Sequence, residues 1–220
     1  TIGVSMALYH RAMTGEGQKI DVSMLDCQVA VLENAISRYL VNGEIPGPIG
    51  NRHPSITPFE GFTASDGYVI VGAGNDRLWK KLCELLGKPE LTTDPRFVTN
   101  GDRTNNQKAL KPILDSVFKT KTIDAWLVVL EEAGIPCAPI NTVDRVLKDP
   151  QIKARNMIVE VEHPVAGKMH IPGVPIKMSQ TPGTVEKAAP LLGQHTEEIL
   201  SEMLGYDNAK VQELRDKGIL

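Results

Sequence analysis

Three consecutive polar side chains are the clearest candidate for ligand chemistry in the sequence. Asn51, Arg52 and His53 stand in a row, preceded by Gly50 and followed by Pro54. An amide, a guanidinium and an imidazole together supply hydrogen-bond donors and one permanent positive charge, which suits a carboxylate or a thioester oxygen. These residue types favour a loop that binds a ligand, and a loop with a purely structural role remains the alternative.

A second candidate lies where an apolar run gives way to a helical pattern. Gly72 and Gly74 have no side chains, so a ligand can approach the backbone there, close to the expected start of a helix. Asn75 follows them and carries an amide that suits either a ligand or the N-cap of that helix. Two glycines are also typical of a simple tight turn, so both interpretations stay open.

The other reactive side chains favour structural roles. Asp21 and Asp26 flank a short apolar run, and the helix dipole accounts for an acid in a first helical turn. Cys27, Cys83 and Cys137 are far apart and set among apolar residues, which predicts reduced thiols in the core. No serine-nucleophile elbow, phosphate-binding loop or metal-binding motif occurs, so we expect no metal site.

Composition and charge narrow the classes of partner. Of the 220 residues, 41% are hydrophobic and 23% are charged, and the formal net charge is −3. The absence of a basic stripe with interleaved aromatics argues against nucleic acid. No run approaches the roughly 18 apolar residues that a membrane span needs. Together with reduced thiols, these features predict a cytoplasmic protein with no membrane partner.

Hydrophobic periodicity predicts the first elements. Ile2, Met6, Tyr9 and Met13 recur at spacings of three or four, which predicts a buried helix over residues 1–14. Because neither an N-cap nor an initiating methionine precedes this helix, we expect its packing partners on polypeptide that comes before residue 1. A short strand is expected over residues 19–23, followed by one long helix over residues 25–42.

Composition changes in the next segment. Residues 43–58 contain four prolines and three glycines, which excludes a helix or a central strand and predicts a linker or a functional loop. The elements expected directly after this loop are a hairpin of strands 59–64 and 68–71, a helix after Asn75, helices over 102–119 and 122–133, and an extended segment over 135–140. Strands over 157–162 and 168–172 are expected next. Two helices, capped by Thr196 and Asp207, complete the chain, and the second ends at Gly218.

Seven segments, read together and in order, resemble the class III CoA-transferase family, the CaiB/BaiF group. They cover nearly all of the chain, and the ordered set is more specific than any single segment. The segments are Arg11-x-x-Thr14-Gly15-x-Gly17-Gln18-x-x-Asp21-Val22-Ser23-Met24-Leu25-Asp26, Gly50-Asn51-Arg52-His53-Pro54, Asp66-Gly67-Tyr68-x-x-Val71, Gly74-Asn75-Asp76, Asp94-Pro95-Arg96-Phe97, Gly134-Ile135-Pro136-Cys137-Ala138-Pro139 and Pro190-Leu191-Leu192-Gly193-Gln194-His195-Thr196. Within the family, residues 71–75 and 139–141 share the character of the succinyl-CoA:glutarate CoA-transferase type.

The resemblance implies an α/β fold with a partial Rossmann-like large domain and a small α+β domain. Residues 1–43 would end the first large-domain segment, residues 44–136 would form the linker and the small domain, and residues 137–220 would return to the large domain. The resemblance places the family's nucleophilic aspartate before residue 1, so it implies no catalytic residue in this chain and an inactive fragment. It also implies an intertwined homodimer.

The family's chemistry, as the resemblance implies it, moves CoA from an acyl-CoA to a small carboxylic acid, with dicarboxylic acids as one option, through an aspartyl-CoA intermediate. Acyl-CoA is then a substrate, and no permanently bound cofactor is expected. A glycine-rich loop covers the site in oxalate-using members. Here residues 47–54 correspond to it, with Asn51, Arg52 and His53 in place of most glycines, which argues against oxalate and makes Arg52 and His53 candidates to hold an acceptor carboxylate.

Two other functions fit parts of the same pattern. α-Methylacyl-CoA racemases share the fold and use a His/Asp pair, which would also lie before residue 1. They tend to carry a glutamate where this chain has Asn75, and this difference favours the transferase. A non-catalytic module that binds acyl-CoA is the third possibility. The expected substrate-binding residues are Asn51, Arg52, His53, Gly72, Gly74 and Asn75.

Overall fold

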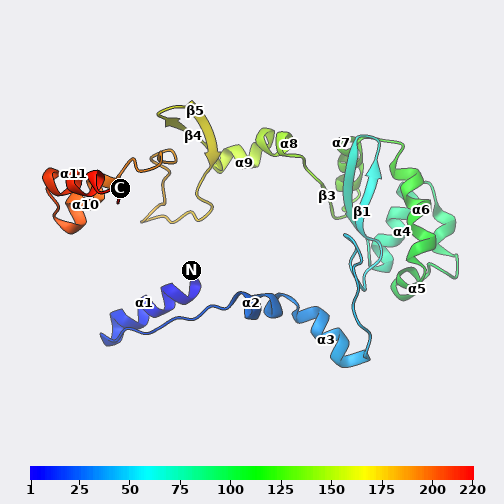
Figure 1. Cartoon of the computed structure of the whole chain (residues 1–220). Coiled ribbons are helices and arrows are strands. Elements are labelled where there is room, and N and C mark those ends of the chain that lie inside the picture. Colours follow the sequence, from blue (N-terminus) through cyan, green and yellow to red (C-terminus); the bar gives the residue numbers. More distant parts are fainter. The chain divides into compact units, whose positions relative to one another are not determined.

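A computed structural model describes residues 1–220 (Figure 1). The chain divides into two compact units, Thr1–Ala138 and Pro139–Leu220. No helix combines the length and the apolar character that a membrane crossing requires. The assignment of residues 1–43, 44–136 and 137–220 to segments of a larger fold stays a prediction.

The chain begins with three helices, α1 (Ile2–Thr14), α2 (Met24–Val31) and α3 (Glu33–Asn42). Gly15 and Gly43 end α1 and α3 in the left-handed conformation, with φ of 79° and 72°, which a glycine adopts without a steric penalty. The predicted long helix is interrupted at Leu32, where ψ is 9°, so that expectation was wrong in its continuity.

Two further expectations for this region need correction. The first helix forms, but none of its residues is buried, and Ile2 is 82% exposed, because no other segment of the first unit covers its apolar stripe. The strand predicted over residues 19–23 is absent. A strand satisfies its backbone groups only by pairing, and none of the strands of this chain pairs with that segment.

The centre of the first unit is a small sheet. Strands β1 (Phe59–Ala64) and β2 (Gly67–Gly72) form an antiparallel hairpin in which Phe62 pairs with Val69, and β3 (Cys137–Pro139) adds to the β2 edge. The predicted hairpin is confirmed. The helices that follow it are α4 (Asp76–Leu85), the short 3₁₀ helix η1 (Pro89–Thr92), α5 (Asn100–Asn105), α6 (Gln107–Phe118) and α7 (Ile123–Glu132).

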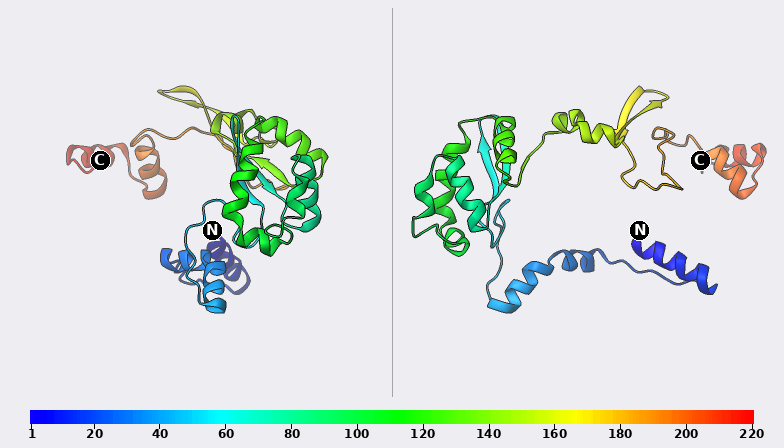
Figure 2. Two further views of the ribbon diagram at one scale, coloured as in Figure 1. Left: turned by 90° about the vertical axis from the view of Figure 1, so that its right-hand side faces the viewer. Right: turned by 180° about the vertical axis from the view of Figure 1, so that it is seen from behind.

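Helices pack on this hairpin and close a single apolar core. α6 contacts β1 and α7 contacts β2, and in Figure 2 the cyan strands lie against the green helices. Phe118 lies at the centre, with its ring centroid 4.8 Å from that of Phe62 and 4.9 Å from that of Trp126. The other large, fully buried side chains are Trp79, Leu82, Phe97, Leu110, Leu114, Leu130 and Ile135.

Helix caps in this unit follow the sequence closely. The side chains of Asn75 and Thr122 accept the N–H groups of Leu78 and Ala125, which confirms both as N-caps. The helix predicted over residues 102–119 is instead two helices, because a capping box of Thr99 and Asp102 starts α5 and the backbone breaks at Asn106.

The second unit contains two short helices, a hairpin and two terminal helices. Its elements are α8 (Val143–Lys148), α9 (Pro150–Ala154), β4 (Ile158–His163), β5 (Gly167–Pro172), α10 (Thr196–Leu204) and α11 (Asn208–Asp216). The antiparallel β4–β5 hairpin confirms the prediction. α8 and α9 were not predicted, because one or two turns carry too little periodicity.

The ends of the two last helices also differ slightly from expectation. His195 occupies the N-cap position of α10, and Thr196 is the first helical residue rather than the cap. The Asp207 side chain accepts the N–H of Lys210 at 2.8 Å, which confirms that cap. α11 ends at Asp216, and Gly218 follows with a φ of 67°.

Candidate functional site

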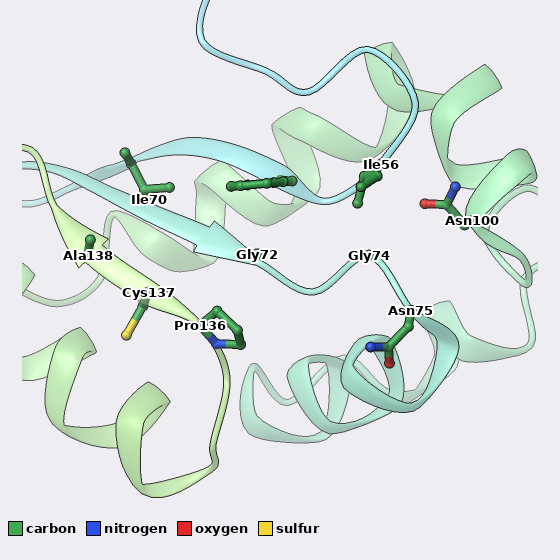
Figure 3. A pocket seen from close by; sticks show the side chains of 10 residues that line it. Ile56, Ile70, Gly72, Gly74, Asn75, Asn100, Pro136, Cys137 and Ala138 are labelled. Carbon is green, nitrogen blue, oxygen red and sulfur yellow. The ribbon is translucent and has the colours of Figure 1, made fainter. Parts of the chain in front are cut away.

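A cavity of about 630 Å³ opens beside the end of strand β2 in the first unit (Figure 3). This volume is within the range of roughly 300–1,000 Å³ that is typical of small-molecule sites. The loop before β1, the β2–α4 turn, α5 and the entry to β3 supply its walls. Its lining residues are Ile56, Phe59, Ile70, Gly72, Gly74, Asn75, Asn100, Pro136, Cys137 and Ala138.

Backbone hydrogen bonds fix the β2–α4 turn along this cavity. The N–H of Gly72 donates to the carbonyl of Pro136 at 2.8 Å, and the N–H of Ala73 donates to the carbonyl of Pro58 at 2.8 Å. Asn75 then starts α4 by accepting the N–H of Leu78 on its Oδ1 atom at 2.8 Å. The turn is therefore tied to both neighbouring segments, and the Asn75 amide retains its Nδ2 donor.

Gly74 is required by a close approach. Figure 3 shows Ile56 facing Gly74 across the cavity wall. A Cβ atom placed on Gly74 would lie 2.0 Å from the Cγ2 atom of Ile56, which no side chain tolerates without movement of its neighbour. A Cβ atom on Gly72 would lie 3.6 Å from Phe59, an ordinary contact. Steric demand therefore explains Gly74 but leaves Gly72 free to vary.

Asn100 holds the wall that Ile56 contributes. Its Oδ1 atom accepts the N–H of Thr57 at 3.0 Å, and its Nδ2 atom donates to the carbonyl of Ser55 at 2.8 Å. One amide thus satisfies the backbone on both sides of Ile56. Sequence reasoning missed Asn100, and its only local signal is its place in the first turn after the Thr99 cap.

Arg103 connects the two walls from inside the core. Its side chain is fully buried, and it donates from Nε to the carbonyl of Thr57 and from Nη2 to the carbonyl of Gly74, both at 2.7 Å. Nη2 also reaches Asp76 Oδ1 at 3.1 Å, and the guanidinium lies over the ring of Trp79.

Burial lowers the pKa of Arg103 below its ordinary value, while the hydrogen bond to Asp76 opposes that shift. An arginine nevertheless stays charged at neutral pH. Sequence reasoning also missed this residue, because nothing local distinguishes a buried arginine from an exposed one.

His53 packs against Phe59, one of the residues that line the cavity. Its ring stacks on Phe59, with centroids 5.6 Å apart and planes 3° from parallel. The N–H of Ser55 donates to its Nδ1 atom at 3.2 Å, which places the proton of the neutral ring on Nε2. His53 therefore presents one N–H donor while its other nitrogen fixes the loop.

Asn51 and Arg52 do not line the same cavity. The Oδ1 atom of Asn51 accepts the N–H of Gly61 at 3.4 Å, so this side chain holds the loop against strand β1. Arg52 instead lines a second hollow, on the side of α5 and α6. The six predicted site residues are thus divided: Gly72, Gly74 and Asn75 line the cavity, whereas Asn51, Arg52 and His53 do not.

Two of the cysteines, Cys83 and Cys137, are not activated as nucleophiles. Burial is the main cause that raises the pKa of the Cys137 thiol in the cavity wall, and burial raises that of Cys83 to about 12. Both thiols are therefore protonated at neutral pH, and a protonated thiol is a poor nucleophile. Cys27 is exposed and Cys137 only partly buried, so the prediction of three core thiols holds for Cys83 alone.

The cavity can therefore bind and shield a ligand, but its lining supplies no activated nucleophile. Apolar side chains form most of it, and two amides, Asn75 and Asn100, provide polar atoms at its edge. This arrangement suits an uncharged segment of a substrate that also carries a polar group.

Comparison with known proteins identifies the family of this chain. A family model described as CoA-transferase family III matches residues 1–196. The chain belongs to this family. The resemblance found in the sequence is thereby confirmed, and so is membership of a family of CoA-transferase enzymes.

The relatives in this family include named enzymes. The human succinyl-CoA:glutarate CoA-transferase is 36% identical over 219 residues, which are 99% of this chain and 50% of that protein. The acetyl-CoA:oxalate CoA-transferase of Acetobacter aceti is 42% identical over 177 residues, which are 80% of this chain and 44% of that protein. The chain spans about half the length of these relatives.

A solved structure supports the fold. The crystal structure of a CaiB/BaiF family protein from Brucella suis matches with a TM-score of 0.78 and 39% identity, over 91% of this chain and 52% of that one. The mixed α/β fold with small antiparallel sheets is therefore confirmed as that of a CaiB/BaiF family protein.

Proposed function

We propose that these 220 residues form part of a CoA-transferase that moves CoA from an acyl-CoA to a small carboxylic acid. The observation that carries this proposal is the family match over residues 1–196, on a chain whose cavity is apolar and has no activated nucleophile. Glutarate and oxalate, in the names of the two relatives, are dicarboxylic acids, which supports a dicarboxylic acceptor. We keep the prediction that the polar loop at residues 51–53 disfavours oxalate.

The proposed reaction needs one reactive carboxylate, which we place on an aspartate that precedes Thr1. Its oxygen attacks the thioester carbonyl of the donor, and the C–S bond breaks to give a mixed anhydride and the CoA thiolate. The thiolate then attacks the aspartyl carbonyl, which releases the donor acid and leaves an aspartyl-CoA thioester. The acceptor acid passes through the same steps in reverse and departs as its CoA thioester.

The cavity is suited to protect such intermediates. A mixed anhydride hydrolyses if water reaches it, so the apolar walls supplied by Ile56, Phe59 and Pro136 serve to exclude water. The Asn75 Nδ2 donor is positioned by its own helix cap and can bind a thioester oxygen. Gly72 and Gly74 allow that part of the substrate to lie against the backbone.

Among the loop residues, we assign to His53 the binding of substrate at the cavity. Its Nε2–H is the free donor, and its stacking on Phe59 fixes the ring. It can hold an acceptor carboxylate, while Asn51 keeps the loop attached to strand β1. Arg52 contributes positive charge from the neighbouring hollow.

We further propose that the complete protein is an intertwined homodimer located in the cytoplasm. Helices α1, α2 and α3 bury none of their residues, and Met24 and Val41 are 86% and 88% exposed. Apolar surface of this kind is stable in water only when another part of the protein or a partner chain covers it. Light scattering of the complete protein gives its molar mass and tests the dimer directly.

The test of function uses the complete gene product that contains these residues. It is incubated with succinyl-CoA and a panel of acids, glutarate, oxalate, acetate and butyrate, and the CoA thioesters are separated by liquid chromatography. The expected result is a new thioester of one acid, together with a peptide from the segment before Thr1 that gains the mass of CoA less one water. Exchange of an α-proton without transfer would indicate a racemase, and the absence of both activities would leave only a binding module.

A further inference from the structure

The second hollow of the first unit is polar and separate from the apolar cavity. It has a volume of about 480 Å³ and lies between the loop before β1 and the junction of α5 and α6. No residue lines both this hollow and the apolar cavity. Its lining residues are Pro48, Ile49, Arg52, Thr104, Asn105, Gln107 and Lys108.

Two cations face this hollow, and no acid lines it. Arg52 is partly buried and Lys108 is exposed, and neither makes a salt bridge within the chain. Glu60, on the neighbouring strand β1, already has partners for its negative charge. It accepts two hydrogen bonds from Gln107 Nε2, at 2.9 and 3.2 Å, and lies 4.0 Å from the ammonium of Lys111.

Another hollow of the first unit, along α4, differs from this one because acids line it together with cations. Its lining also contains cations, Arg77, Lys80 and Lys81, but Asp76 and Glu84 line it with them. Positive charge in that hollow is therefore balanced locally. Around Arg52 and Lys108 it is not, and a partly buried guanidinium is screened less by solvent than an exposed one.

We propose that Arg52 and Lys108 form a binding site for an oxyanion carried by a substrate. The guanidinium can hold two oxygens of a carboxylate or a phosphate in its planar fork, and the ammonium adds a second charge. The Asn105 amide is the further donor in the lining. The inference rests on the proposed function, which supplies both sources of such a group: the second carboxylate of a dicarboxylic acid and the phosphates of CoA.

The site also separates the roles of neighbouring loop residues. Arg52 binds the remote charge of the substrate, whereas His53 does not line the polar hollow and stacks on Phe59, which lines the apolar cavity. A substrate bound by both would have its reacting group in the dry cavity and its remote charge in the polar hollow. Such a division keeps the second charge away from the apolar walls, where burial would be costly.

The experiment measures binding to the complete protein by titration calorimetry, with succinate, CoA and pantetheine as probes. Pantetheine carries the thiol arm of CoA without its phosphates. The test variant is R52Q/K108Q, and the matched control is R77Q/K80Q, which removes the same charges from the balanced hollow on α4. Because the Lys108 side chain is exposed, K108E serves as a second variant whose folding is not at risk.

If the site binds a carboxylate, R52Q/K108Q should bind succinate about tenfold to a hundredfold more weakly, and its affinity for CoA should not change. If the site binds a phosphate, the affinity for CoA should fall by the same factor, and the affinity for pantetheine should not change. In either case K108E weakens the affected probe and the control variant does not. The site would be overturned if R52Q/K108Q bound succinate and CoA within twofold of the unaltered protein. It would also be overturned if the unaltered protein bound neither succinate nor CoA. These readouts need no turnover, so they stay distinct from the test of CoA transfer.

Discussion

Replacing Arg103 with methionine should loosen both walls of the apolar cavity at once. The change keeps much of the buried volume but removes every hydrogen bond of the guanidinium. Those bonds reach the carbonyls of Thr57 and Gly74 at 2.7 Å, and further acceptors on Phe97, Val98 and Asp76 lie at 3.1–3.2 Å. Of the four carbonyls that lose their partner, those of Thr57 and Gly74 lie on the two segments that line the cavity.

The expected cost follows from these contacts. Each hydrogen bond from a charged donor contributes about 1.5–3 kcal/mol net, and a buried carbonyl left without a partner costs about 1–3 kcal/mol. The desolvation of the guanidinium, which R103M relieves, offsets part of this sum. We therefore expect a net loss of about 3–5 kcal/mol, the range typical of breaking a buried charged network.

Hydrogen exchange followed by mass spectrometry is the appropriate assay, because the complete protein need not unfold in a single step. At about 1.4 kcal/mol per factor of ten, the expected loss lowers the protection of amides in β1, β2 and α4 by about a hundredfold to a few thousandfold. R77M, at an exposed arginine on α4, is the control and should lower protection less than threefold. If R103M and R77M differ by less than tenfold, the central role given to Arg103 is wrong.

Three further predictions test the site and its support. G74A should destabilise the first unit by about 1–3 kcal/mol in thermal unfolding, because the new Cβ atom would lie 2.0 Å from the Cγ2 atom of Ile56. Adding I56A should restore most of that stability, and additive effects of the two substitutions would contradict the contact. Hydrogen bonds from Thr99 hold the pKa of Asp102 below its usual value, so its carboxylate stabilises the fold above the unfolded pKa of about 4, and this contribution fades as pH falls. The melting temperature of D102N should therefore fall less than that of the parent between about pH 5 and pH 3, and equal slopes would reject the linkage. Iodoacetamide at about pH 8 should label partly buried Cys137 well before fully buried Cys83, whose pKa burial raises to about 12, and equal rates on peptide mapping would count against that difference in burial.

Local chemistry made much of the first unit predictable. The hairpin turn and the Asn75 and Thr122 caps depend on hydrogen bonds between residues a few positions apart, so their signals lie in short stretches of sequence. Gly72 and Gly74 also line the cavity, and their role in binding stays a prediction. The strand expected at residues 19–23 failed for the opposite reason, because a strand depends on a partner that no local pattern supplies.

The cavity depends on contacts between distant parts of the chain. Asn100 reaches Thr57 across 43 positions, and Arg103 reaches the same residue across 46. Nothing in the residues around either one signals these bonds. The neighbours Arg52 and His53 illustrate the same limit, because they are adjacent in sequence, yet Arg52 lines the polar hollow and His53 stacks on Phe59.

The sequence by itself determined the family, the order of the elements in the small sheet and its helices, and the residue types available for anion and thioester binding. Ordered motifs and turn chemistry are properties of short segments, and they persist whatever the rest of the chain does. Tertiary structure alone decided that Arg103 is buried and hydrogen-bonds to both walls of the cavity, and that Gly74 must lack a side chain. It also decided that Arg52 lines the polar hollow while its neighbour His53 packs on Phe59. Those outcomes depend on packing and burial, which arise only when distant segments exclude water together.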